Sequence, residues 1–148
     1  MYYPTLAEVK KLKGKGNLVP VYREVVGDLE TPVSVFLKVA GGGYSFLLES
    51  VEGGQRLARY SFIGTDPYHV ITTHGKDNTD PLPLIAAELY QYRLVPVSGL
   101  PRFSGGAVGY LAYEAVTRFE NLPSPAADPL GLPEALFMFV DTMLVYDH

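Results

Sequence analysis

The feature that most restricts the fold of this chain is residues 44–64, YSFLLESVEGGQRLARYSFIG, which predicts two β-strands joined by a tight turn. Side chains point alternately to the two faces of a strand, and the first half of this stretch places large apolar residues at every second position. Gly53 and Gly54 supply the backbone conformations that tight turns require. The second half alternates again, with Tyr60 and Phe62 on one face. The stretch therefore predicts a β-hairpin.

Two polar residues, Glu49 and Ser50, stand at the end of the first apolar strand. A glutamate carboxylate can pair with an ammonium group, and a serine hydroxyl can both donate and accept a hydrogen bond. The pair thus fits a site for an amine. It equally fits a strand that ends at the polar rim of its sheet, and the residues alone leave both interpretations open.

Two helices are predicted before the hairpin. Thr5 and Glu8 have the spacing of a capping box, which predicts a short helix that runs to about Lys13. Thr31 followed by Pro32 predicts the start of a second helix, because a hydroxyl cap and a proline both favour the first helical turn. The second helix carries apolar residues at helical spacing, which predict its buried face: Val33, Phe36, Leu37 and Ala40.

The remaining elements are mostly strands. Further strands are predicted at residues 17–26, 68–73, 104–113 and 134–147, the last as one long run rich in Phe, Met and Val. Asp80 and Pro81 predict the start of another helix, and residues 114–119 a short one. Strands and helices do not alternate regularly, as they would in a parallel α/β protein. The sequence therefore predicts an α+β fold with a largely antiparallel sheet.

Length and composition restrict the function. The 148 residues suffice for one domain, residues 1–148, with a core of its own. The hydrophobic fraction of 47% and charged fraction of 19% are those of a globular chain, and a net charge of −4 gives no reason to expect nucleic acid or an anionic membrane as a partner. No apolar run approaches the ~20 residues that span a bilayer. The absence of cysteine fits a cytoplasmic protein.

No motif predicts catalysis or a resident metal. His69 and His74 lie five residues apart without a carboxylate or cysteine at ligand spacing. Gly105, Gly106 and Gly109 do not have the spacing of a dinucleotide-binding loop. The acidic residues are scattered, and none pairs on one helix face with a histidine. We therefore expect no catalytic and no metal-binding residues in this chain.

Several segments together carry a resemblance to a known family. They are the Leu-Leu-Glu-Ser element at 47–50 and the stretches ETPVSVFLK, RYSFIGTDP, GGAVGYLAYEAV and DPLGLPEALFMFVDTMLVYDH. In this order they resemble the N-terminal region of anthranilate synthase component I, over roughly residues 19–148. The likeness covers nearly the whole chain. Relatives have a longer connection near Lys76 and Asp77, so this chain has either a shortened loop or a sequence that lacks residues there.

The resemblance implies a fold and an activity. It implies half of a β-sandwich flanked by helices, whose sheets are completed by a C-terminal chorismate-binding region that this chain does not contain. The whole enzyme makes anthranilate and pyruvate from chorismate, with Mg²⁺ and with ammonia from a glutamine amidotransferase subunit, component II. The catalytic and Mg²⁺-binding motifs of the family belong to the C-terminal region. We therefore expect this chain alone to be inactive, and to expose apolar sheet surface that its other half would cover.

The resemblance also implies a feedback site for L-tryptophan. By this likeness, Glu49 and Ser50 lie near the amino group of the ligand, Arg59 is the basic residue of the return strand, and Leu48 forms part of an apolar wall. Two alternatives remain: a purely structural module that docks the other subunit and the catalytic half, and the matching region of aminodeoxychorismate synthase component I.

Overall fold

The computed structural model describes residues 1–49, 59–77, 79–123 and 128–148. In these ranges the strands form two three-stranded antiparallel sheets. The first sheet has the order β1-β2-β6, with β1 at Ser45–Leu48, β2 at Tyr60–Thr65 and β6 at Met143–Asp147. The second has the order β3-β5-β4, with β3 at His69–Thr73, β5 at Ala135–Val140 and β4 at Gly106–Leu111. The predicted α+β class is confirmed.

The hairpin that organises the sequence is present. β1 pairs with β2 in antiparallel register, from Ser45 opposite Thr65 to Leu48 opposite Phe62. Ser61 and Ile63 of β2 are buried on one face, as the alternation of the return strand predicts. The predicted turn at residues 52–55 lies outside the described residues.

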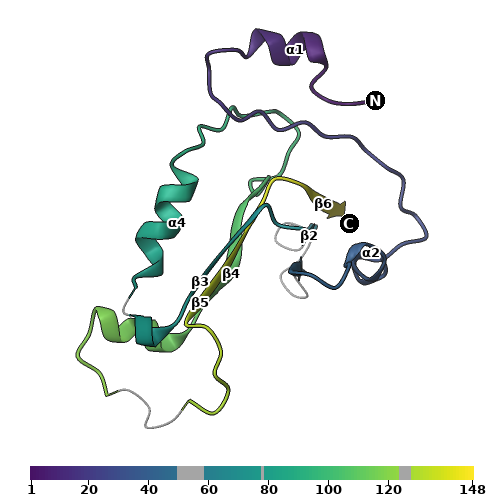
Figure 1. Cartoon of the computed structure of the whole chain (residues 1–148). Coiled ribbons are helices and arrows are strands. Elements are labelled where there is room, and N and C mark those ends of the chain that lie inside the picture. Colours follow the sequence, from purple (N-terminus) through teal and green to yellow (C-terminus); the bar gives the residue numbers. More distant parts are fainter. Residues whose placement is uncertain (50–58, 78, 124–127) are drawn as a thin grey trace.

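The long apolar run at 134–147 is two strands, so its prediction as a single strand is wrong. β5 ends at Val140 and β6 begins at Met143, and the two strands belong to different sheets. Asp141 and Thr142 form the crossing, which Figure 1 shows as the yellow trace that passes from β5 to β6. Because both strands are rich in the same large apolar residues, composition does not reveal the break. The two polar residues are its signal.

The predicted strand at 17–26 is also wrong. This segment forms only isolated bridges in the described structure, Tyr22 with Tyr3 and Leu18 with Leu94. Pro20 has no N–H group to donate, so a continuous ladder cannot form through it.

The helices begin where their caps predict. α1 spans Leu6–Lys11 and has the predicted capping box, in which the Thr5 N–H donates to Glu8 Oε2 at 2.7 Å. α2 spans Pro32–Val39 and α4 spans Pro81–Leu89, capped by Thr31 and by Asp80. Two short 3-10 helices are present, η1 at Gly75–Asp77 and η2 at Tyr113–Arg118, and η2 lies where the sequence predicts a short helix.

The buried face of α2 differs from the prediction. Val33 and Leu37 are 46% and 72% exposed, whereas Val35 and Phe36 are half-buried and Pro32 is buried. α2 contacts the first sheet at β1 and β2. Its eight residues are too few for periodicity to fix the rotation of the helix, which instead follows the burial of Pro32 in its first turn.

The core lies between the two sheets. Phe46 of the first sheet packs with Met138 and Val140 of the second, and partly buried side chains surround them: Phe62, Val70, Phe103, Val108 and Leu136. A Cβ on Gly64 would meet the ring of Phe46, so glycine is required for this close approach. α4 packs on the outer side of the second sheet, against β3 and β4 (Figure 1). This arrangement agrees with the predicted antiparallel β-sandwich half flanked by helices.

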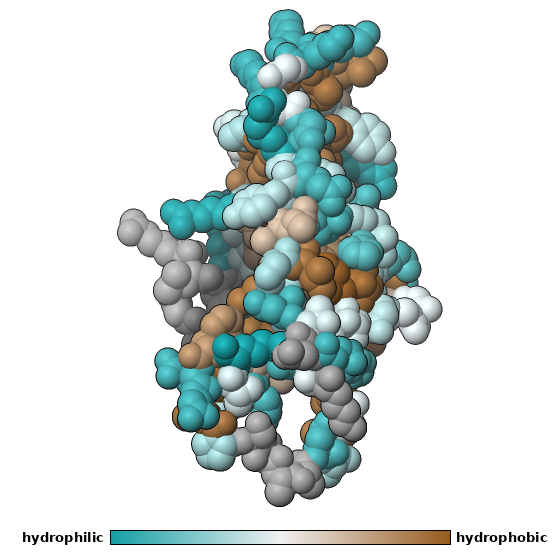
Figure 2. Space-filling model, turned by 60° about the vertical axis from the view of Figure 1, so that its left-hand side comes forward, coloured by the Kyte–Doolittle hydropathy of each residue, from teal (hydrophilic) through white to brown (hydrophobic). Residues whose placement is uncertain are grey.

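Much apolar surface remains uncovered. The chain exposes 10963 Å², whereas a compact monomer of its 16.2 kDa exposes about 7,500 Å². Figure 2 shows apolar side chains, in brown, at the surface of one face. Leu29 is 99% exposed and Val26 84%. Such surface usually belongs to an interface.

Candidate functional site

The end of the hairpin is where the four predicted ligand residues fall. Leu48 is the last residue of β1 and its side chain is exposed, as is that of Glu49 directly after it. Ser50 lies outside the described residues. Arg59 directly precedes β2. The predicted residues thus come from the end of one strand and the start of its neighbour.

The guanidinium group of Arg59 is paired with a carboxylate that sequence reasoning did not identify. Arg59 Nε lies 2.6 Å from Asp147 Oδ1, and Nη2 lies 2.7 Å from Oδ2. The guanidinium also lies 4.9 Å from the ring centroid of Tyr60. The hydrogen bond with Asp147 raises the pKa of Arg59, and the same bond lowers the pKa of the Asp147 carboxyl. Arg59 therefore binds a carboxylate through a planar, two-bond contact.

The register of the first sheet explains why these residues meet. Tyr60 stands opposite Asp147, and the His148 N–H donates to the Arg59 carbonyl at 2.9 Å. The start of β2 thus lies beside the end of β6. The side chains of Arg59 and Asp147 are 55% and 51% exposed, so a solute can reach both. In the sequence, they lie 88 positions apart, and no periodicity indicates that they pair.

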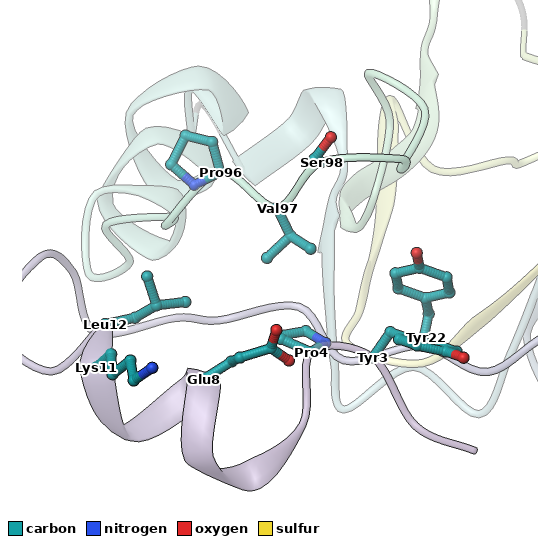
Figure 3. Close-up of a pocket in the computed structure, with 9 residues that line it drawn as sticks. All are labelled: Tyr3, Pro4, Glu8, Lys11, Leu12, Tyr22, Pro96, Val97 and Ser98. Atoms are coloured by element: carbon teal, nitrogen blue, oxygen red, sulfur yellow. The ribbon is translucent and has the colours of Figure 1, made fainter.

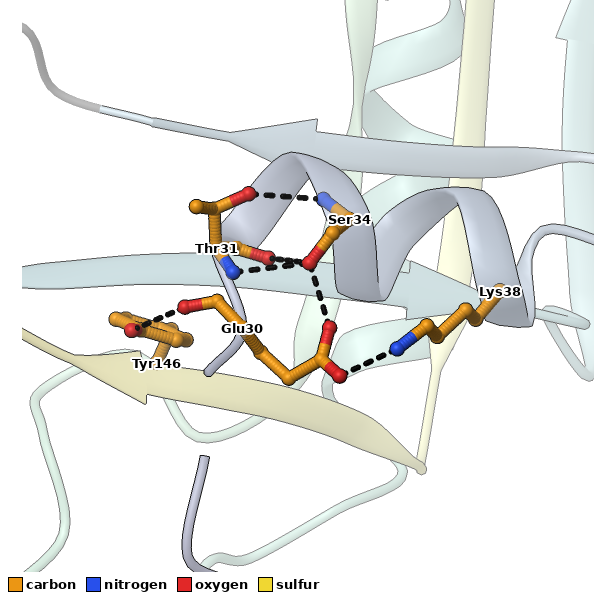
Figure 4. A network of polar contacts seen from close by, with 5 residues as sticks. All are labelled: Glu30, Thr31, Ser34, Lys38 and Tyr146. Atoms are coloured by element: carbon orange, nitrogen blue, oxygen red, sulfur yellow. Dashed lines mark hydrogen bonds and ion pairs between the residues drawn. The ribbon is translucent and has the colours of Figure 1, made fainter. Parts of the chain in front are cut away.

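The other face of the same sheet carries a polar network that is structural. The Tyr146 hydroxyl donates to the Glu30 backbone carbonyl at 2.7 Å, and the Ser34 hydroxyl donates to Glu30 Oε2 at 2.6 Å. Lys38 forms an ion pair with the same carboxylate, as Figure 4 shows. Hydrogen bonds from Lys38 and Ser34 lower the pKa of Glu30. These contacts hold α2 to β6.

A serine and a histidine meet on this face. Ser61 Oγ lies 2.8 Å from His148 Nε2, the distance of a nucleophile from its base in hydrolases. Ser61 is fully buried, however, so no substrate can reach its hydroxyl. The pair satisfies a buried polar group.

A cleft of about 420 Å³ lies elsewhere, between α1 and the loop at 96–98 (Figure 3). Its lining residues are Tyr3, Pro4, Glu8, Lys11, Leu12, Tyr22, Pro96, Val97 and Ser98. The carboxylate of Glu8 already accepts hydrogen bonds from Thr5 in the capping box, which lower its pKa. We do not assign a site to this cleft.

The described residues contain no group of three or more His, Cys, Asp or Glu side chains that could hold a metal ion. The ring of His69 packs on Phe139, with 5.6 Å between their centroids. Within the same ranges, no helix is long and apolar enough to cross a membrane.

Among the ion pairs of the described residues, that of Arg118 and Glu134 is largely buried. Arg118 Nη2 lies 2.5 Å from Glu134 Oε2, and the two side chains are only 15% and 8% exposed. The hydrogen bond with Glu134 raises the pKa of Arg118. This pair ties η2 to the residue before β5.

Sequence and structure comparisons define the class of protein. The family model described as chorismate binding enzyme matches residues 43–148, and the chain belongs to that family. Over 162 aligned residues it is 43% identical to anthranilate synthase component 1 of Acetivibrio thermocellus, covering 100% of this chain and 33% of that protein. It is 45% identical to a probable anthranilate synthase component 1 of Schizosaccharomyces pombe, covering 99% of this chain and 30% of that protein.

A solved structure has the same fold. The chain matches the crystal structure of anthranilate synthase component I from Streptococcus pneumoniae with a TM-score of 0.53 and 24% identity, over 86% of this chain and 29% of that one. The chain thus spans about a third of the length of the relatives that it matches. The resemblance found in the sequence is confirmed.

Proposed function

We propose that this chain is the N-terminal regulatory part of an anthranilate synthase component I and contributes a feedback site for L-tryptophan. The proposal rests most on the similarity to such proteins, which extends over 99–100% of this chain. The chain covers only 30–33% of the length of those proteins. The whole polypeptide would convert chorismate and glutamine to anthranilate and pyruvate. Residues 1–148 would form one domain, completed by a C-terminal chorismate-binding domain and partnered by component II, in the cytoplasm.

The proposed ligand fits the residues at the end of the hairpin. An amino acid presents an ammonium group, which Glu49 and Ser50 would accept, and a carboxylate, which suits the guanidinium of Arg59. Leu48 is exposed and would pack on the indole ring. The accessible position of Arg59 supports this assignment, because a buried arginine could not exchange one carboxylate for another.

Catalysis is proposed to reside outside this chain. Mg²⁺ prefers oxygen ligands such as carboxylates, and the described residues bring no three such groups together. We therefore expect the 148-residue chain to make no anthranilate from chorismate with either glutamine or ammonium. Anthranilate fluorescence is the readout, with heat-treated protein as the control, and turnover above that control would contradict the assignment.

Inhibition curves of the complete gene product test the tryptophan site. Ser50→Ala, Ser50→Phe and Glu49→Gln should weaken inhibition while uninhibited turnover stays nearly unchanged. The loss of one hydrogen bond to a charged group corresponds to roughly ten- to a hundredfold in inhibitor affinity. Glu52→Gln, in the turn predicted from the sequence, is the matched control, and L-tryptophan should inhibit this variant as it inhibits the wild type. Wild-type curves for all the site variants would refute the tryptophan site.

The exposed apolar surface favours a second candidate, a docking module without a ligand. Val26 and Leu29 are among the exposed large apolar side chains, at 84% and 99%, and burial of apolar surface is worth roughly 25 cal/mol per Å². Co-expression with the C-terminal half should therefore raise the solubility of the chain. A docking role alone predicts this gain together with unchanged tryptophan inhibition in the variants above.

A further inference from the structure

We propose that Asp147 acts as an internal competitor for the carboxylate of the amino-acid effector, because its own carboxylate is bound to the guanidinium of Arg59. This inference rests on the proposed function and concerns the regulation of the same site. When the effector binds, its carboxylate would replace that of Asp147 as the partner of Arg59. Asp147 thereby lowers the affinity of the site for effectors that carry a carboxylate.

The geometry supports a direct substitution. Asp147 places both carboxylate oxygens on Arg59, at 2.6 and 2.7 Å, so the contact has the planar two-bond form that an α-carboxylate would also adopt. The guanidinium carbon of Arg59 also lies over the ring of Tyr60, 4.9 Å from the ring centroid. The Asp147 carboxylate and the α-carboxylate of the proposed ligand are thus the same chemical group, and both would bind the same two N–H groups of Arg59.

The charge of Asp147 also lowers the affinity for a carboxylate ligand that binds the other edge of the guanidinium and leaves the Asp147 contact in place. A second carboxylate beside Asp147 would bring two negative charges to one arginine, and like charges at short range disfavour each other. The negative charge of Asp147 therefore opposes a carboxylate ligand in either arrangement. It does not oppose an ammonium group.

The exposure of the pair makes the exchange feasible. Arg59 and Asp147 are 55% and 51% exposed, and exposed ion pairs contribute little to stability, so one partner can be replaced at low cost. The buried pair of Arg118 and Glu134 is different, because separating it would leave a charge without a partner in the interior. Of these two arginines, only Arg59 is available to a solute.

The test is L-tryptophan binding to the complete gene product, measured by calorimetry for Asp147→Asn. We expect about two- to fivefold tighter binding than in the wild type, the range that an exposed charge pair represents. Asp141→Asn is the matched control. It removes an equal charge from the exposed crossing between β5 and β6, where Asp141 accepts a hydrogen bond from Thr142, and it should leave binding unchanged. Asp147→Ser serves as a second variant if the first is poorly folded.

Two further measurements assign the effect to Arg59 and to the carboxylate. In an Arg59→Gln background, Asp147→Asn should no longer tighten binding. Tryptamine, which lacks the carboxylate, should bind Asp147→Asn no more tightly than the wild type. If Arg59→Gln weakens L-tryptophan binding but Asp147→Asn leaves it unchanged or weaker, Asp147 orients the arginine and the competition is refuted. If the wild type does not bind L-tryptophan, or Arg59→Gln binds it normally, the proposed function fails and the competition fails with it.

Discussion

Tyr146 of β6 donates a hydrogen bond of 2.7 Å to the backbone carbonyl of Glu30, just before α2 begins. The two residues are 116 positions apart in the sequence. This bond joins the last strand of the chain to the entry of the helix that covers the first sheet. The rotation of α2, which helical periodicity did not predict, is thereby linked to the position of β6.

Tyr146→Phe should therefore destabilise the chain by about 0.5–1.5 kcal/mol, the net contribution of a typical hydrogen bond. Urea unfolding of the chain measures the change. Tyr90→Phe is the control, because Tyr90 is 87% exposed and its variant should unfold like the wild type. Equal midpoints for Tyr146→Phe and the control would show that the bond contributes nothing.

Gly109→Ala should prevent β4 from pairing with β5. A Cβ at Gly109 would overlap the backbone of Leu136 and Phe137, and backbone atoms cannot move aside as a flexible side chain can. We expect a cost above about 3 kcal/mol, beyond ordinary overpacking, and thus a loss of soluble protein. Gly41→Ala has open space around its Cβ and should remain soluble. A soluble Gly109→Ala variant with an unchanged melting temperature would contradict the register of these strands.

The buried and the exposed ion pair should respond differently to loss of one carboxylate. Glu134→Gln leaves the largely buried Arg118 without its counter-charge and should lower the urea midpoint clearly. Asp147→Asn leaves Arg59 in water and should change the midpoint little. The comparison uses the same chemical change at both sites, and equal effects would contradict the difference in burial.

Acid should destabilise the chain, in part through Glu30. Hydrogen bonds from Lys38 and Ser34 lower the pKa of Glu30 below its ordinary value of 4.5, so the folded state binds fewer protons than the unfolded state as the pH falls. The resulting stability is complete above the unfolded pKa and disappears as the pH falls through the folded pKa. Melting temperatures between about pH 2 and 7 should show a shallower acid decline for Glu30→Gln than for the wild type. A parallel decline would exclude this contribution.

The elements that carry their own local signals were predictable. Thr5 and Glu8 mark the start of α1, Thr31 and Pro32 that of α2, and side-chain alternation marks β1 and β2. Each signal depends on residues within one turn of helix or one strand. For that reason the fold class could be predicted from the sequence.

Features set by distant partners were not predictable. The division of residues 134–147 between two sheets depends on which strands lie beside each half, and both halves have the same composition. The partner of Arg59 is Asp147, which reaches it only through the register of β2 with β6. Arg59 could be proposed for the site from its family resemblance, but its occupied state could be found only in the folded chain.

The crossing from β5 to β6 has a consequence for synthesis on the ribosome. β3 and β4 pair with β5 and not with each other, so the second sheet cannot form until residues 135–140 have emerged. The first sheet likewise waits for β6, and only the hairpin of β1 and β2 can pair earlier. Pairings between residues so far apart form slowly. During translation, β3, β4 and the second edge of β2 therefore remain without their partners until nearly all of these 148 residues have been made.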